Sequence, residues 1–235
     1  YEIGRVLDAI DMYAPDNTVV IFTSDHGDHL GAFGLGAKGP TMYDHTVAVP
    51  LLIAGPGIQS GTSSESLVGA VDVWATIMDY CGVNPKDRDH FPMHKGYDGR
   101  SLRAILKGET EHSRDAVIIE YNRFGEKHHQ VNGLFPIRCI RTQEWKLSIN
   151  LFDMDELYNV QNDPQELVNY IDDPSLATIR NQLHDELLAW QEQTRDLFRN
   201  PMWSQRVWRA GLDVAFQGLH TTGFAEDWQF GRLTD

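Results

Sequence analysis

The sequence predicts an α/β fold in which part of a parallel-sheet domain is followed by a small antiparallel sheet packed on a long C-terminal helix. Three observations predict this class. Residues 18–24 are a nearly continuous run of β-branched and aromatic residues, which is typical of a strand buried on both faces of a parallel sheet. From residue 116, short strand patterns follow one another without helices between them. A long amphipathic helical pattern then covers residues 175–198.

Residues 1–112 are predicted to be the C-terminal part of the parallel-sheet domain. Apolar residues recur at helical spacing in three segments, and two apolar runs bounded by Gly, Pro and Asn residues indicate strands. Two strands are too few for a complete doubly wound domain, so we expect further strands from elsewhere. The predicted elements are helices over residues 2–12, 71–80 and 101–106 and strands over residues 18–24 and 47–54.

Residues 113–199 are predicted to form an antiparallel meander covered on one face by the long helix. The meander strands are expected over residues 116–121, 137–142, 145–150 and 156–160. Residues 200–235 form an aromatic-rich tail with little periodicity. We expect this tail to wrap across its own protein, because so many exposed aromatic side chains would favour aggregation.

Composition excludes some functions. The chain has 235 residues, 41% of them hydrophobic, and a net charge of -14, so no basic surface is predicted that could bind nucleic acid. No apolar run approaches the length of a membrane span. Cys81 and Cys139 lie in apolar surroundings without metal-binding spacing, which favours buried structural thiols over a disulfide, a metal site or a nucleophile.

Polar residues follow the strand of residues 18–24 at the edge where α/β sheets bind ligands. Asp25 and His26 end this strand, and Gly27 permits a sharp exit. A carboxylate and an imidazole can hold a divalent cation, and because the strand ends here the two side chains could share one ion. The alternative is a structural role in capping and turn hydrogen bonds. Asp28, His29 and His45 are expected to be loop and surface residues.

The glycine-rich loop of residues 31–40 is expected to fold back over the strand end. It fails as a phosphate-binding P-loop, because Lys38 is followed by Gly39 instead of Ser or Thr. It also fails as a dinucleotide fingerprint, because Asp25 and His26 stand between the strand and the glycines. The remaining prediction is one lysine, Lys38, held close to the Asp25-His26 pair.

These motifs together resemble the C-terminal half of a sulfatase of the alkaline-phosphatase superfamily. The matching segments are residues 19–28, 30–31, 38–40, 42–44, 49–53, 55–57, 141–142, 145–147 and 156–166, together with Asn169. The resemblance implies that Asp25 and His26 are metal ligands and that Lys38 is a catalytic residue that contacts the sulfate oxygens. It implies calcium first, whereas the imidazole of His26 leaves manganese, magnesium or zinc open. The substrate would be a sulfated small molecule or carbohydrate.

The sequence also departs from the family pattern. Sulfatases carry a C/S-x-P/A-x-R motif whose first residue becomes the formylglycine nucleophile, and neither Cys81 nor Cys139 lies in such a motif. The family's N-terminal metal ligands are missing as well. We therefore expect a C-terminal portion of a longer sulfatase, which is inactive alone and needs the N-terminal part of the same protein as its partner. The alternatives are a phosphonate or phosphate ester hydrolase of the same superfamily and a non-catalytic sulfatase-like fragment.

Two histidines, His128 and His129, lie in the polar loop of residues 122–133 between predicted meander strands. A loop of this kind could reach a substrate, but a solvated surface is the favoured interpretation. Neither residue is assigned a role. The sequence leaves the substrate identity, the oligomeric state and the cellular location open.

Overall fold

The chain divides into two compact units in a computed structural model that describes residues 1–83, 99–123 and 135–209. Unit 1 comprises residues 1–39 and 43–117, and unit 2 comprises residues 40–42 and 118–235. Residues 40–42 therefore belong to unit 2 although unit 1 flanks them on both sides in the sequence. Among the helices of the described ranges, none is long and apolar enough to cross a membrane.

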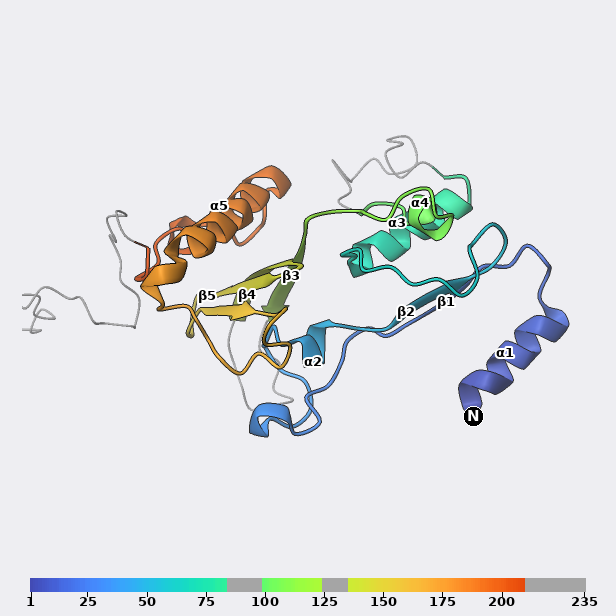
Figure 1. The fold of residues 1–235 in the computed structure, drawn as a ribbon, viewed down its shortest axis with the longest axis horizontal. Helices are drawn as coiled ribbons and strands as arrows, with labels where there is room; N and C mark the ends of the chain where they lie inside the picture. The colour runs from blue at the N-terminus through green and yellow to red at the C-terminus, as the bar shows by residue number, and fades with distance from the viewer. Residues whose placement is uncertain (84–98, 124–134, 210–235) are drawn as a thin grey trace, which may run out of the picture. The chain divides into compact units, whose positions relative to one another are not determined.

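Unit 1 contains the helices that the apolar spacing predicts (Figure 1). Its main helices begin and end within two residues of the predicted bounds. A short helix, α2, and a 3-10 turn, η1, are additions that the sequence did not predict. The elements are α1 (Glu2–Tyr13), β1 (Val20–Thr23), η1 (Ala32–Gly34), α2 (Asp44–Val47), β2 (Leu51–Ala54), α3 (Ala70–Tyr80) and α4 (Arg103–Leu106).

The two strands of unit 1 differ from the prediction in direction and in burial. β1 and β2 pair antiparallel, with Val20 opposite Ala54 and Thr23 opposite Leu51, so the predicted parallel relation between them is wrong. β1 is also not buried on both faces, because Phe22 is 39% exposed. An apolar run indicates that a strand prefers to be buried. It does not indicate which other strand will pair with it, or whether the pairing is parallel or antiparallel.

A buried carboxylate, that of Asp72, holds the segment after residue 99 against α3. It accepts hydrogen bonds from the backbone N–H of Arg100 at 2.7 Å and from the Arg114 guanidinium. The hydroxyl of Thr76, one turn further along α3, accepts from the Leu102 N–H at 2.9 Å. The side chains of Asp72 and Thr76 thus both have hydrogen-bond partners, which is the condition for burying such polar groups in a core.

Unit 2 is a four-stranded sheet in the order β3-β4-β5-β6, with α5 packed against β4 and β5. β4 pairs antiparallel with β5, and β5 with β6, which confirms the predicted antiparallel sheet and its helix (Figure 1). Apolar side chains of the sheet and of α5 are fully buried and form the core: Ile140, Leu147, Ile149, Leu157, Leu183 and Leu187. The elements are β3 (Ala116–Arg123), β4 (Phe135–Thr142), β5 (Trp145–Asn150), β6 (Glu156–Asn159), η3 (Pro174–Leu176), α5 (Ala177–Thr194) and η4 (Pro201–Trp203).

The first ten residues of the tail pack on unit 2, as the aromatic content predicts. Trp203 is buried, and the Arg206 guanidinium donates two hydrogen bonds to the Asp155 carboxylate, at 2.6 and 2.8 Å. The indole N–H of Trp208 donates to the same carboxylate at 2.8 Å. The tail beyond residue 209, and the loop that contains His128 and His129, lie outside the described residues.

The two cysteines differ from each other. Both are free thiols, and Cys139 is buried in β4 as predicted. Cys81 is exposed at the end of α3, so the prediction of a buried thiol is wrong there. Its place at the helix terminus explains the difference, because an apolar residue near a helix end need not face the core.

A buried histidine, His184, joins α5 to the tail. Its Nε2–H donates to the carbonyl of Trp203 at 2.7 Å, and Nδ1 accepts from the Arg209 guanidinium at 2.7 Å. The pKa of His184 is lowered to about 4, chiefly by burial and also by the cations of Arg209 and Arg206, whereas the Trp203 carbonyl and Asp185 act in the opposite direction. The ring is therefore neutral in the native protein at neutral pH.

Because His184 is neutral in the native protein, we expect the protein to lose stability in mild acid. The unfolded chain gains a proton at His184 as the pH falls below 6.5, whereas the native chain does not until about pH 4. At 1.36 kcal/mol per pKa unit, the free energy of unfolding should fall by roughly 3 kcal/mol over this range. Urea unfolding of the complete protein at several pH values between 7 and 4 measures this fall in the free energy of unfolding. His184→Gln should flatten the pH dependence, and the exposed control His112→Gln should not; equal slopes in all three proteins would contradict the assignment.

Candidate functional site

The residues predicted to form the site meet where β1 ends. Asp25 and His26 follow the end of β1 after a single residue, Ser24, and the Lys38 Nζ atom lies 2.5 Å from Nε2 of His26. Oδ2 of Asp25 lies 3.4 Å from the same His26 nitrogen. The chain thus brings a carboxylate, an imidazole and an ammonium together within unit 1, although Lys38 is twelve residues away from His26. We call Asp25, His26 and Lys38 the strand-end cluster.

Gly27 shapes the exit from the strand. Its N–H donates to the carbonyl of Thr46 at 2.9 Å, so the backbones of the two segments touch. A Cβ atom at position 27 would lie 2.0 Å from the carbonyl oxygen of His45, which no side chain could tolerate. The sequence predicted a glycine for a sharp turn, and the physical reason is this close approach of two backbones.

The loop that carries Lys38 is closed by its own backbone bonds. The His29 N–H donates to the Ala37 carbonyl, and the Gly31 N–H donates to the Leu35 carbonyl, each at 3.0 Å. Non-glycine residues in the left-handed region occur here at Leu30, Phe33 and Ala37, with φ of 49°, 56° and 58°. Such strain persists only where the surroundings impose it, and it is common at functional sites.

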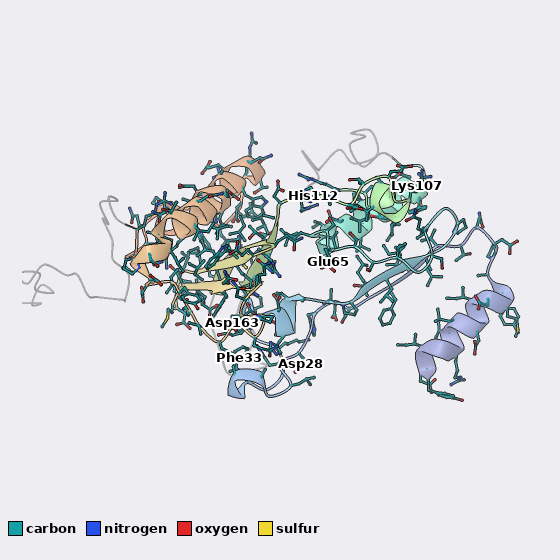
Figure 2. The ribbon with its side chains drawn as sticks, viewed as in Figure 1. Asp28, Phe33, Glu65, Lys107, His112 and Asp163 are labelled. Atoms are coloured by element: carbon teal, nitrogen blue, oxygen red, sulfur yellow. The ribbon has the colours of Figure 1, made fainter. Side chains whose placement is uncertain are left out.

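Aromatic packing adds to the order of this loop. Phe33 stacks on Tyr43 with ring centroids 4.1 Å apart. Figure 2 shows Phe33 and Asp28 on the same loop. His29 packs edge-on against both rings and is only 2% exposed, so the expectation of a surface residue is wrong for His29. Loops have no regular alternation of apolar and polar residues, so the sequence pattern could not predict that the His29 side chain is buried.

Hydrogen bonds fix the state of the His26 ring. Nδ1 lies 2.8 Å from the carbonyl oxygen of its neighbour Gly27, so Nδ1 carries a proton, and in the neutral ring Nε2 presents its lone pair toward Lys38. The pKa of the Asp25 carboxyl lies below its usual value, first because of its attraction to the His26 ring when that ring is protonated, and also because of the His26 backbone N–H and Lys38. Asp25 is therefore an anion, and its side chain is 85% exposed.

Asp25 and His26 suit a divalent cation as part of its ligand set. Cations bind oxygen and nitrogen ligands at roughly 2.0–2.6 Å, so two donor atoms 3.4 Å apart can share one ion. A backbone carbonyl on the second ring nitrogen is the usual support for a metal-binding histidine. Within the described residues, however, no group of three or more His, Cys, Asp or Glu side chains could hold a metal ion. The pair thus fits an ion whose remaining ligands come from elsewhere.

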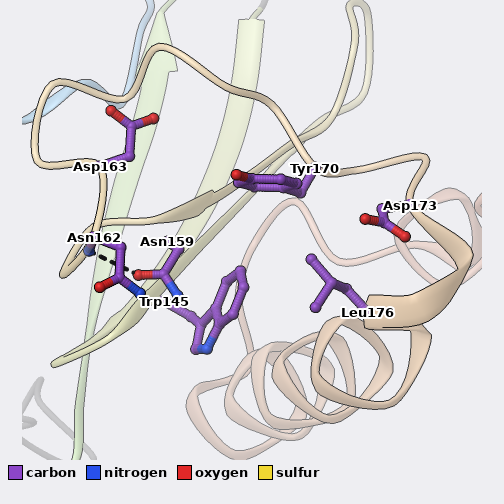
Figure 3. Close-up of a pocket in the computed structure, with 7 residues that line it drawn as sticks. All are labelled: Trp145, Asn159, Asn162, Asp163, Tyr170, Asp173 and Leu176. Carbon is purple, nitrogen blue, oxygen red and sulfur yellow. Dashed lines mark hydrogen bonds between the residues drawn. The ribbon is translucent and has the colours of Figure 1, made fainter.

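A separate hollow of about 330 Å³ lies in unit 2, and Figure 3 shows the side chains around it. The rings of Trp145 and Tyr170 meet there edge to face, with centroids 6.5 Å apart. Its carboxylates are engaged in their own loops, since Asp163 accepts from the Leu167 N–H and Asp173 from the Ser175 N–H. None of Asp25, His26 and Lys38 lines this hollow. The hollow therefore does not support the predicted roles of these residues in metal binding and ester hydrolysis.

Comparison with known proteins identifies the family. Residues 31–193 match the family described as N-sulphoglucosamine sulphohydrolase, C-terminal. The chain belongs to this sulfatase family, as the resemblance predicts. An uncharacterized sulfatase of Escherichia coli (strain K12), YidJ, is 36% identical over 217 residues, which cover 92% of this chain and 41% of YidJ.

Solved structures agree with this family and with the predicted alkaline-phosphatase-like fold. BT4656, solved with its substrate D-glucosamine-2-N,6-O-disulfate, matches with a TM-score of 0.70 and 28% identity over 83% of this chain and 38% of its own. The phosphonate monoester hydrolase of Agrobacterium radiobacter matches with a TM-score of 0.69 and 28% identity over 82% of this chain and 39% of its own. This chain thus spans about two fifths of the length of these proteins.

Proposed function

We propose that this chain is the C-terminal portion of an enzyme that hydrolyses sulfate esters of small molecules or carbohydrates. The observation that carries the proposal is the strand-end cluster, in which Lys38 Nζ lies 2.5 Å from His26 and Asp25 Oδ2 lies 3.4 Å from the same ring. Membership of the sulfatase family supports it, as does the sulfated sugar bound by the similar protein BT4656.

In this proposal each residue of the cluster has a distinct role. Asp25 and His26 ligate a divalent cation, calcium first, with manganese, magnesium or zinc suited by the imidazole. A bound cation would supply positive charge that polarises the ester. The Lys38 ammonium contacts the sulfate oxygens and neutralises negative charge on the oxygen that leaves as the S–O bond breaks. This requires Lys38 to turn from the His26 lone pair toward the substrate.

The missing nucleophile and metal ligands are proposed to come from an N-terminal portion of the same protein. Unit 1 supports this, because apolar side chains of its strands are exposed, including Phe22 and Leu52. Expressed alone, residues 1–235 should aggregate or remain partly molten and should show no aryl sulfate turnover. Co-expression with the N-terminal portion should restore turnover. A cooperatively melting preparation of residues 1–235 alone that hydrolyses an aryl sulfate would contradict this proposal.

The second candidate is hydrolysis of phosphonate or phosphate esters. The similarity to a phosphonate monoester hydrolase favours it, and a histidine at position 26 is compatible with it. The complete protein should be assayed with 4-nitrophenyl sulfate, 4-nitrophenyl phenylphosphonate and 4-nitrophenyl phosphate. We expect the largest kcat/KM for the sulfate. A larger value for the phosphonate would replace the proposed function by the second candidate, and no turnover of any ester would favour a non-catalytic protein.

The metal site is tested by removing its two ligands. Asp25→Ala and His26→Ala should each abolish divalent-ion binding by the complete protein, because the loss of a ligand leaves the set incomplete. The fold should persist, since the Asp25 side chain is exposed at a strand end. Calorimetric titration with calcium and with manganese measures the affinity. His112→Ala, an exposed histidine in unit 1, is the matched control; unchanged affinity in both ligand variants would place the ion elsewhere.

A further inference from the structure

The loop that carries Lys38 has little packing of its own. Of residues 30–39, none is buried, and four are glycines. A Cβ atom at Gly36 or Gly39, on either side of Lys38, would meet no heavy atom of the described residues within 4 Å beyond its own chain neighbours. Glycine-rich segments of this kind sample many backbone conformations. Order in the loop, and with it the place of the Lys38 ammonium, must therefore come from a small number of contacts.

The side chain of Phe33 ties the loop to the residues around the start of α2. Its ring stacks on that of Tyr43, with centroids 4.1 Å apart and planes 20° from parallel, and it meets the His45 ring edge-on at 5.4 Å. Aromatic pairs of this kind contribute more than their buried area alone. The backbone of Phe33 lies in the left-handed region, with φ of 56°, and a residue other than glycine stays there only where its surroundings hold it. The stack on Tyr43 supplies such a restraint.

His29 extends these contacts to the residue before Lys38. Its ring packs edge-on against Phe33 and Tyr43, with centroid distances of 6.4 and 6.0 Å, and the residue is 2% exposed. Its backbone N–H donates to the carbonyl of Ala37 at 3.0 Å. A displacement of the Phe33 ring would therefore disturb His29 and, through the His29 backbone, the segment that ends at Lys38.

The same contacts lead back to the strand-end cluster. Tyr43 is the N-terminal cap of α2, and its carbonyl accepts from the Thr46 N–H at 2.8 Å. The Thr46 carbonyl in turn accepts from the N–H of Gly27, the residue after His26, at 2.9 Å. All of these residues belong to unit 1. The loop is thus tied to the chain beside His26, whose ring lies 2.5 Å from the Lys38 Nζ atom.

We propose that Phe33 is a positioning residue for Lys38, and that its stack on Tyr43 holds the loop so that the Lys38 ammonium meets the sulfate. This inference rests on the proposed function of Lys38. Phe33 acts on the reaction through the loop backbone and Lys38, not through contact with the substrate. A displacement of a catalytic group by about 1 Å can cost up to a hundredfold in rate, so loss of the stack lowers kcat.

The experiment replaces Phe33 in the complete protein. Phe33→Leu keeps an apolar side chain but removes the stack, whereas Phe33→Tyr keeps the stack. Phe33→Gly removes the stack and suits the left-handed backbone, so it separates the aromatic contact from the backbone conformation. Phe152→Leu changes an exposed phenylalanine of unit 2 and is the matched control. If Phe33→Leu does not fold, Tyr43→Leu removes the same stack from its other side.

Each change is made in the natural protein and in the Lys38→Ala variant, and kcat and KM are measured with 4-nitrophenyl sulfate. We expect Phe33→Leu and Phe33→Gly to lower kcat by roughly tenfold in the natural background, with a smaller change in KM, and not at all in the Lys38→Ala background. Phe33→Tyr should recover most of this loss, and Phe152→Leu should cause none. An unchanged kcat in a folded Phe33→Leu or Phe33→Gly variant would overturn the inference, and so would equal losses in both backgrounds.

Amide hydrogen exchange tests the order of the loop without an activity measurement. The N–H groups of His29 and Gly31 close the loop, so both should exchange faster in Phe33→Leu than in the natural protein and at a near-natural rate in Phe33→Tyr. Unchanged exchange in Phe33→Leu would overturn the inference whatever the kinetics show. Full activity of Lys38→Ala would instead overturn the proposed function of Lys38, so the two failures are distinguishable.

Discussion

Replacing Lys38 by alanine in the complete enzyme is expected to lower kcat by roughly a hundredfold or more while the metal content stays unchanged. A hundredfold loss corresponds to about 2.7 kcal/mol, which is typical for removing one charge-stabilising group from a transition state. The expectation rests on the exposed ammonium of Lys38 lying 2.5 Å from the proposed metal ligand His26. Steady-state kinetics with an aryl sulfate, together with metal analysis of the purified variant, measure both quantities.

Two further variants sharpen this prediction. Lys107→Ala removes a partly exposed lysine whose ion pair with Glu109 lies elsewhere in unit 1, and it should leave kcat unchanged. Lys38→Arg keeps the charge but not the compact ammonium, and it should recover only part of the activity. If Lys38→Ala retains the full kcat, Lys38 is an ordinary loop residue.

Asp196→Ala is expected to destabilise unit 2 by up to roughly 3–5 kcal/mol, because the buried Arg138 guanidinium loses its closest carboxylate and keeps only a longer ion pair, 3.4 Å to Glu120. The Arg138 guanidinium is fully buried and donates to both Asp196 oxygens, at 2.7 and 2.8 Å. Burial raises the pKa of Asp196, but the Arg138 hydrogen bonds more than offset this, so the pKa lies below its usual value and the carboxyl is ionised. Urea unfolding of the complete protein, monitored by tryptophan fluorescence, measures the loss in the free energy of unfolding.

The cause of this loss can be separated from a packing effect. Arg138→Met combined with Asp196→Ala removes both charges and should recover much of the stability lost in the single variant. Glu192→Ala breaks an exposed ion pair with Arg199 and should cost less than about 1 kcal/mol. If the double variant is less stable than Asp196→Ala, the packing of Arg138 against the rings of Phe198 and Trp203 outweighs the charge effect.

Local patterns predicted the fold of unit 2 more fully than that of unit 1. The meander strands follow one another directly, so alternation and turn residues define both the strands and their neighbours. β1 and β2 are separated by the Lys38 loop and α2, and their pairing depends on contacts that no local pattern encodes. Val47, predicted to begin the second strand, ends α2 instead, and the strand begins after Pro50.

The strand-end cluster was predictable because its residues lie in an ordered series of motifs. The approach of Lys38 to His26 follows from the glycine-rich loop of residues 31–40, which folds back toward the strand end. The buried Lys146–Glu166 ion pair was visible only as two separate motif residues, and its contact with Met42 depends on packing across 104 residues. Buried charges such as Arg138 gave no signal, because an arginine in a strand pattern usually faces water.

Helix α1 has a consequence for how the protein assembles. None of its residues is buried, and the apolar side chains of Ile3 and Val6 are 56% and 60% exposed. An isolated helix of twelve residues is marginal in water, and ordering its backbone costs about 1–2 kcal/mol per residue. Helix formation over these residues is therefore coupled to covering their apolar stripe. Amide hydrogen exchange in α1 should be fast while the stripe is open and slow once it is covered, so exchange in this segment should report the proposed assembly with the N-terminal portion.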